Sequence, residues 1–364
     1  MPKILIAGAS GVVGNGAMEY FAAREGWDVV GVSRRPPISD APNAEHIRLD
    51  LTDAEACASV FGRMADVTHI YYAALNERDG DMMGGWRDIE QIDRNARMLT
   101  NLFDPLIAVA RDFRHIALIH GGKAYGMHVP GLKLPVPLRE DQPRHPGENF
   151  YYRQEDYIRA KQAGRPWSWT ILRASTIVGP AIGANMNSFL NLVVFAVLRR
   201  EAGLKLPVPL PRSSMTEMTD TRLIADAAAW AADAPTAHGQ IFNIHNGDLF
   251  AIHDAYPIVA QALGMELEEP THFNLGVEID RLAPLWPDIV KRHGLRSPAN
   301  VDALLGNSKE IASVWSASVA PGDEMRWGLT SATKLRLAGY PGCVDTIEML
   351  YRYIDRFRAL RIIP

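Results

Sequence analysis

The chain has few cysteines, little net charge and no long apolar run. Its 364 residues include two cysteines, Cys57 and Cys343, too few for a disulfide framework, so we expect a reducing compartment. A net charge of −4 gives nucleic acid or an anionic membrane no electrostatic reason to bind. No apolar run reaches the roughly 18 residues that a membrane span needs. Because the first strand starts at residue 3, we expect no signal peptide and a cytoplasmic protein.

The stretch from residue 3 to residue 15 has the pattern of a nucleotide-binding strand, turn and helix. An apolar run meets three glycines in G-x-x-G-x-x-G spacing, and a helix-compatible segment follows. Glycine lets the backbone turn tightly and approach a pyrophosphate, and the free N–H groups of a helix N-terminus attract its charge. The alternative is a tight turn that binds nothing. We expect a dinucleotide to be held by Gly8, Ser10, Gly11, Val12, Val13 and Gly14.

The end of the second strand indicates which dinucleotide binds. The second strand is expected within residues 27–37, and its end carries Ser33, Arg34 and Arg35 with no acidic residue at that point. NAD-binding enzymes usually place Asp or Glu there for the ribose 2′-hydroxyl, whereas an arginine accommodates the 2′-phosphate of NADP. The sequence therefore predicts NADPH as cofactor. The alternative is a pair of solvated arginines before a proline-rich turn.

Later strand ends are expected to border the same cofactor. Asp50 and Leu51 follow a short strand, and such a pair commonly lies beside the adenine in this fold. The alternative is that the stretch serves only to start a helix, capped by Asp53. Ala73 and Ala74 end the fourth strand and are small enough for the cofactor to lie close. Ile177 lies at the end of the strand expected at 167–178 and is expected to border the cofactor as well.

Two tyrosine–lysine pairs are candidates for catalysis. Tyr157 and Lys161 are four residues apart, so on a helix they share one face, where an ammonium lowers the pKa of a phenol. The alternative for them is an exposed helix pair. Lys123 instead leaves the end of the fifth strand, where the ligand crevice of an open α/β sheet lies. Tyr152, at the head of the following helix, would point into the same crevice.

Several separated stretches resemble the progesterone 5β-reductase/iridoid synthase-like enzymes, an atypical branch of the extended short-chain dehydrogenase/reductases. The N-F-Y-Y-x-x-E-D signature of that family is matched in full by residues 149–156. Its other signatures are similar to Gly8 to Asn15, Arg34-Arg35-Pro36, Gly121 to Tyr125 and Arg361 to Pro364. The resemblance thus spans nearly the whole chain.

The resemblance implies that Tyr152 and Lys123 are the catalytic pair and that both also touch the cofactor. It further implies NADPH-dependent reduction of the activated C=C bond of a small hydrophobic enone. The chain departs from the family at Leu75, Ala124 and Ala174, which concerns the substrate more than the reaction. Two other readings remain: an NAD-dependent sugar-nucleotide epimerase or dehydratase that uses Tyr157 and Lys161, and an NADPH-sensing regulator without turnover.

The fold expected is α/β, a Rossmann doubly wound parallel sheet with a smaller, mainly helical substrate lobe. Residues 1–180, completed by about 214–248, form the NADP-binding domain, and residues 181–213 and 249–364 form the lobe. The sequence leaves a homodimer open. Between the strands we expect a loop at 79–85, a long helix at 89–110, a proline-rich loop at 129–146, a helix at 185–200 on the substrate side and mainly helices from 250 to 357.

Overall fold

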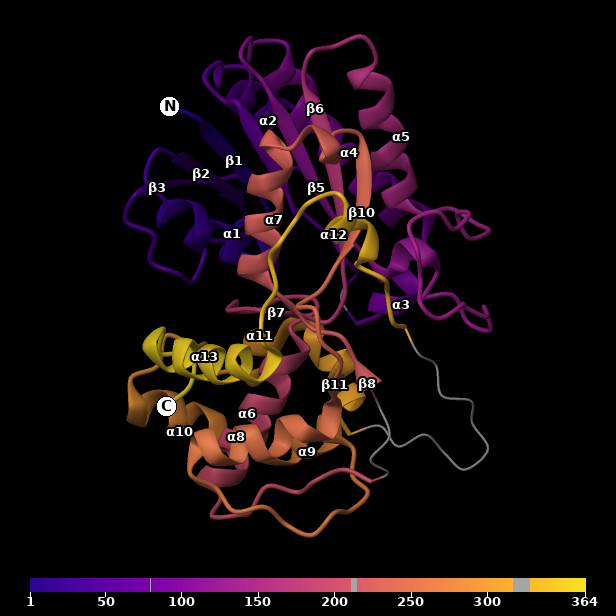
Figure 1. The fold of residues 1–364 in the computed structure, drawn as a ribbon. Coiled ribbons are helices and arrows are strands. Elements are labelled where there is room, and N and C mark those ends of the chain that lie inside the picture. The colour runs from indigo at the N-terminus through magenta and orange to yellow at the C-terminus, as the bar shows by residue number, and fades with distance from the viewer. Residues whose placement is uncertain (79, 211–214, 317–327) are drawn as a thin grey trace.

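A computed structural model describes residues 1–78, 80–210, 215–316 and 328–364. A seven-stranded parallel sheet fills one half of the molecule, in the order β10-β6-β5-β4-β1-β2-β3 (Figure 1). The order reverses between β1 and β4, and ligands of open α/β sheets bind beyond the strand ends at such a point. The strands are β1 (Lys3–Ala7), β2 (Asp28–Ser33), β3 (Ala44–Arg48), β4 (His69–Tyr72), β5 (His115–Gly121), β6 (Ser168–Ala174) and β10 (Gln240–Ile244).

Helices cover both faces of this sheet, which is why its central strands are apolar nearly throughout. One face packs against α1 (Val12–Ala22), α7 (Thr221–Asp233) and α12 (Thr333–Leu337). The opposite face packs against α2 (Ala54–Phe61), α4 (Ile89–Ile107) and α5 (Phe150–Gln162). The doubly wound fold expected from the alternating strand and helix patterns is therefore confirmed.

The second half of the molecule is a helical lobe beyond the carboxyl ends of the strands (Figure 1). At its centre, α6 (Ser188–Glu201) is buried at every position from 188 to 199, because a helix that is apolar on all sides needs packing on all sides. The predicted helix at 185–200 is thus the core of the lobe more than the wall of a pocket. Around it lie α8 (Ala255–Leu263), α9 (Leu275–Leu282), α10 (Trp286–His293), α11 (Val301–Leu305), a 3₁₀ helix (Gly306–Trp315) and α13 (Thr346–Ala359).

Short elements connect the two halves. β7 (Ile177–Val178) pairs with β9 (Thr219–Asp220) in parallel, and β8 (Met215–Thr216) pairs with β11 (Phe250–Ala251) antiparallel. The chain leaves the sheet after β6 and returns to it at β10, and β8 pairs with β11 of the lobe. The domain boundaries themselves stay a prediction. Within the described ranges, no helix combines the length and apolar character that a bilayer crossing requires.

The prediction of a loop at 79–85 was wrong for its second half. The single-turn helix α3 (Met82–Gly85) forms there, because the side chain of Asp81 caps Gly84 N at 3.0 Å and Glu310 Oε2 accepts from Met82 N at 2.8 Å. Residue 79 lies outside the described residues. The turn delivers Trp86, which is fully buried, to the crevice end of the sheet.

Candidate functional site

The glycine turn after β1 is packed too closely for any side chain. Gly8 has a φ of +85°, and a Cβ on it would lie 2.8 Å from the carbonyl carbon of Ala73 at the end of β4. A Cβ on Gly14 would lie 2.1 Å from the Gly8 carbonyl oxygen. The helix α1 begins at Val12 after Gly11, with no side-chain cap and no acidic residue in its first turn. Its first N–H groups therefore fit the pyrophosphate of a dinucleotide.

The end of β2 presents two arginines. The Oγ of Ser33 donates to the carbonyl of Arg35 at 2.6 Å and lies 3.0 Å from Nε2 of His46, which fixes the turn. Arg35 donates to the Gly183 carbonyl at 2.9 Å, and Arg34 is exposed. Burial and the neighbouring charge of Arg34 lower the pKa of Arg35. Within the described ranges neither guanidinium pairs with a carboxylate, so this turn fits an anion.

The other predicted cofactor residues divide into two groups. Ala73 and Ala74 adjoin the glycine turn, and Ile177 packs with the apolar cluster of Val12 at the start of α1. Asp50 instead caps its own turn, because its Oδ1 accepts from the backbone and the hydroxyl of Thr52, and the adjacent Leu51 is buried. The first group lies beside the predicted pyrophosphate site.

Lys123 lies on a short 3₁₀ turn (Gly122–Tyr125) that directly follows β5. Its Nζ is 3.1 Å from Oε1 of Glu77 and 3.3 Å from the sulfur of Met186, and it lies 4.1 Å from the ring centroid of Trp86. The side chain is 11% exposed, and that of Glu77 is 0% exposed. Burial lowers the pKa of Lys123, whereas the Glu77 carboxylate raises it.

The hydroxyl of Tyr152 is fully engaged by its surroundings. It donates to the carbonyl of Ala124 at 2.7 Å and accepts from the backbone N–H of His145 at 3.0 Å, while Arg144 covers the ring. These bonds tie the proline-rich loop to the head of α5. The predicted catalytic role for Tyr152 gains no support from this geometry.

The neighbouring Tyr151 lies on the crevice side of α5. Its ring stacks on His120 with centroids 4.0 Å apart and meets the ring of Trp86 at 5.1 Å. A Cβ built on Gly121, the last residue of β5, would lie 3.9 Å from its hydroxyl oxygen. In the described part of the chain this hydroxyl forms no hydrogen bond, and burial raises its pKa.

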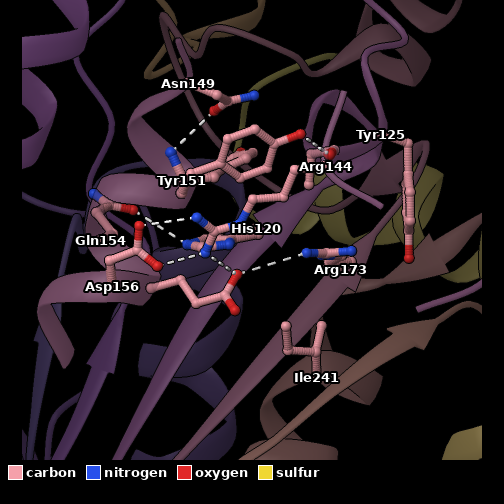
Figure 2. A network of polar contacts seen from close by, with 12 residues as sticks. His120, Tyr125, Arg144, Asn149, Tyr151, Gln154, Asp156, Arg173 and Ile241 are labelled. Carbon is pink, nitrogen blue, oxygen red and sulfur yellow. Dashed lines mark hydrogen bonds and ion pairs between the residues drawn. The ribbon is translucent and has the colours of Figure 1, made fainter. Parts of the chain in front are cut away.

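Two side chains hold Tyr151 in place. Asn149 caps α5 by accepting from Tyr151 N at 3.0 Å, which fixes the first turn of the helix. His120 is itself held by a contact of 3.2 Å between its Nε2 and Oε1 of Gln154, one turn further along α5 (Figure 2). Burial holds the pKa of His120 well below its ordinary value, so the stacked imidazole is neutral.

The second predicted pair lies on the other side of α5. The Tyr157 hydroxyl donates to Oδ1 of Asp104 on α4 at 2.6 Å, and Nζ of Lys161 pairs with the same atom at 2.6 Å. Lys161 is 43% exposed. The pair thus bridges two surface helices and lies away from the strand ends.

Sequence reasoning missed Tyr151, His120, Glu77 and Trp86. The spacing of Tyr151, Gln154 and Ile158, all buried, follows the face of α5 that packs on the sheet, and this periodicity was a signal for Tyr151. No sequence pattern marked Glu77, since a lone glutamate before an arginine reads as a surface residue.

Curated relatives cover almost the whole chain. It is 29% identical over 377 residues to an (S)-8-oxocitronellyl enol synthase of Nepeta racemosa, with 99% of this chain and 92% of the relative covered. Over 376 residues it is 29% identical to the 3-oxo-Delta(4,5)-steroid 5-beta-reductase of Arabidopsis thaliana, with the same coverage. A further (S)-8-oxocitronellyl enol synthase, from Camptotheca acuminata, is 30% identical over 380 residues, covering 99% of this chain and 93% of its own. These relatives confirm the resemblance stated from the motifs.

Solved structures share the fold. The enzyme WbmH of Bordetella bronchiseptica, in complex with NAD+, superposes with a TM-score of 0.64 at 18% identity, covering 98% of this chain and 99% of that one. The UDP-glucose 4-epimerase of Thermus thermophilus, in complex with NAD, gives the same values. Residues 4–244 match the description NAD dependent epimerase/dehydratase family. The chain therefore belongs to the NAD-dependent epimerase/dehydratase family.

Proposed function

We propose that the protein is an NADPH-dependent reductase of enones that adds hydride to the carbon β to the carbonyl. The single observation that carries this proposal is the setting of Tyr151, which lies in the first turn of α5 beside the carboxyl end of β5. Its side chain is buried against Trp86, its hydroxyl makes no hydrogen bond within the described structure, and Lys123 lies against the same tryptophan ring. The named activities of the relatives, an enol synthase and a steroid 5-beta-reductase, agree with chemistry at a conjugated carbonyl.

Tyr151 is proposed as the donor, in place of Tyr152. Because burial raises the pKa of Tyr151, its phenol stays neutral and donates a hydrogen bond to the substrate carbonyl oxygen. As hydride reaches the β carbon, negative charge grows on that oxygen, and a donor already in place stabilises the resulting enolate. The α carbon then takes a proton from water or from the same network. Tyr152, with both its bonds internal, holds the covering loop.

Lys123 is proposed to keep positive charge near the developing enolate and to hold ribose hydroxyls. Its ammonium lies over the indole of Trp86 and against the Glu77 carboxylate, so its position is fixed before substrate arrives. A fixed dipole or charge costs no reorganisation at the moment of reaction. The sulfur of Met186, in the segment before α6, contacts Nζ of Lys123, so the helical lobe also contributes to this site.

The cofactor cradle is proposed to consist of the glycine turn, the start of α1 and the arginines after β2. When bound, NADPH supplies the hydride. The N–H groups at the head of α1 hold the pyrophosphate, and Arg34 and Arg35 bind the 2′-phosphate. Ala73 and Ala74, which follow β4, are small enough for the cofactor to lie close beside the glycine turn.

The proposed substrate is a small hydrophobic enone, and the proposed location is the cytoplasm, with a homodimer as one assembly to test. The reaction is tested by following NADPH absorbance with cyclohexenone, progesterone and a monoterpene dialdehyde, and by identifying the products. We expect a saturated ketone or aldehyde. An allylic alcohol would mean carbonyl reduction, and tightly bound NAD in purified protein with no NADPH oxidation would favour the epimerase alternative.

The cofactor preference is tested separately by binding. In the double variant Arg34→Ala/Arg35→Ala we expect the Kd for NADPH to rise roughly tenfold to a hundredfold, because charge-assisted bonds to the 2′-phosphate are lost. The Kd for NADH, which lacks that phosphate, serves as the control and should stay the same. Equal losses for both cofactors would contradict a phosphate-binding role.

A further inference from the structure

The carboxylate of Glu77 binds two groups of the site at once, the ammonium of Lys123 and the indole of Trp86. Its Oε1 accepts from Nζ of Lys123 at 3.1 Å and from Nε1 of Trp86 at 2.6 Å, and the side chain is completely buried. A buried carboxylate persists only where it is paired and hydrogen-bonded. Both partners of Glu77 lie at the crevice end of the sheet.

Trp86 extends the influence of Glu77 to the proposed catalytic tyrosine. The ring of Trp86 meets Phe150 at 4.5 Å and Tyr151 at 5.1 Å, and the Lys123 ammonium lies 4.1 Å from its centroid. The indole N–H bond to Glu77 is the polar contact that orients this ring. One carboxylate thus fixes the amine directly and the phenol through a single intervening ring.

The backbone on either side of Glu77 is anchored to α4. The N–H of Asn76 donates to Oδ1 of Asn95 at 2.8 Å, and the N–H of Arg78 donates to Oε1 of Gln91 at 2.8 Å. Both α4 side chains are buried. The segment that carries Glu77 is therefore held on both sides by α4, the 19-residue helix on that face of the sheet.

The second carboxylate oxygen of Glu77 argues against a purely structural role. Within the described residues, Oε2 is buried and has no hydrogen-bond partner. A bare buried carboxylate oxygen costs stability, so a residue kept for stability alone would be better neutral or apolar. What the charge does provide is a counter-ion for Lys123.

We propose that Glu77 is a positioning residue that keeps Lys123 charged and aimed, and that orients Trp86 against Tyr151. The proposal rests on the proposed function, because it assigns Glu77 its value through Lys123 and Tyr151. The titratable groups that face Lys123 are the Glu77 carboxylate after β4, Glu310 from the 3₁₀ helix Gly306–Trp315 and His128 after the 3₁₀ turn.

The sign of the expected pH effect follows from these neighbours. Burial lowers the pKa of Lys123, and the carboxylates of Glu77 and Glu310 raise it. In Glu77→Gln the nearer carboxylate is gone, so the pKa of Lys123 falls further and the amine loses its proton at a lower pH. Activity that needs the ammonium then disappears earlier as the pH rises.

The kinetic experiment compares Glu77→Gln, Glu77→Asp and Trp86→Phe with the wild type. For Glu77→Gln we expect kcat to fall roughly tenfold to a hundredfold, with KM for the enone nearly unchanged. The alkaline limb of its pH–rate profile should move down by about one unit. Glu77→Asp keeps the negative charge, so its kcat should lie between those of Glu77→Gln and the wild type, and the alkaline limb of its pH–rate profile should match the wild type. Trp86→Phe keeps a smaller aromatic ring and removes the N–H bond to Glu77 while leaving the Glu77 carboxylate in place, so the alkaline limb of its pH–rate profile should not move.

A second readout needs no turnover. Competitive labelling of the cofactor-free protein with acetic anhydride across a pH series, read by peptide mass spectrometry, gives the pKa of Lys123. A lower pKa in Glu77→Gln supports the proposal, and an unchanged pKa together with an unchanged pH–rate limb overturns it. If the wild type reduces no enone, the proposed function fails, and the labelling still decides whether Glu77 controls the amine.

Discussion

The helix α5 carries a tyrosine near a lysine at each of two places, and their surroundings differ. At the crevice end, Tyr151 has an unbonded hydroxyl within the described structure, and Lys123 pairs with a carboxylate that also holds Trp86. Further along, Tyr157 and Lys161 share the carboxylate of Asp104. A phenol that already donates to a carboxylate has no proton to offer a substrate. Whether a tyrosine hydroxyl can donate to a substrate therefore depends on its hydrogen-bond partners in the folded protein. The spacing of residues in the sequence indicates only which side chains share a helix face.

The largest expected difference between the two places is in the tyrosines. Tyr151→Phe removes the proposed carbonyl donor, so we expect kcat to fall about 10²–10³-fold, the usual cost of one such donor. Tyr157→Phe removes a bond between α4 and α5 and should leave kcat within about twofold. Steady-state NADPH oxidation with the test enone that the wild type reduces fastest measures both, with NADPH affinity as the control for folding.

Tyr152→Phe decides between the two adjacent tyrosines. Because its hydroxyl bonds only to Ala124 and His145 in the described structure, its loss should loosen the covering loop and cost less activity than the loss of Tyr151. A collapse of turnover in Tyr152→Phe, with Tyr151→Phe active, would return the catalytic role to the residue that the sequence predicted.

The lysines should show a smaller contrast of the same kind. Lys123→Met removes the charge beside the proposed enolate, and we expect kcat to fall roughly tenfold or more. It also leaves Glu77 buried without its counter-ion, so the melting temperature should drop. Lys161→Met removes an exposed ion pair and should change stability by less than about 1 kcal/mol. Comparable activity losses in both variants would mean that the two pairs are not distinct.

The last contrast concerns stability in acid and compares His120, at the crevice, with His69, at the opposite end of the sheet. Burial lowers the pKa of His69, at the start of β4, to about 4, and holds that of His120 well below its ordinary value. The unfolded chain takes up these protons near pH 6.5, so the stabilisation is complete above pH 6.5 and falls as the pH drops toward 4.

Chemical denaturation across this pH range measures the loss. Each buried histidine should account for about 1.4 kcal/mol of unfolding free energy per pH unit below its unfolded pKa. His69→Gln should flatten the curve without touching activity, whereas His120→Gln should flatten it and also lower kcat through the ring that supports Tyr151. If the unfolding free energy of His69→Gln depended on pH as steeply as that of the wild type, His69 would take up its proton in the folded protein as readily as in the unfolded chain.

Much of the fold was predictable from local pattern. Apolar runs of strand length, the close-packed glycine turn and the Asn149 cap of α5 are each encoded within a few residues. The site was less predictable because its parts come from distant segments. Glu310 caps α3 from 228 positions away, and this turn delivers Trp86 to Lys123. Which of two adjacent tyrosines faces the crevice depends on the register of α5 against the sheet, which the signature alone does not specify.

The late return of β10 to the sheet bears on how the protein is made. The edge of β6 is covered only when residues 240–244 pair with it, some seventy residues after β6 itself has been synthesised. Until then a strand edge is exposed on the growing chain, and such edges promote wrong pairing. A fragment that stops after β7 would end with that edge uncovered, so we expect it to aggregate, and synthesis on the ribosome to yield a complete sheet only after α7 and β10 have emerged.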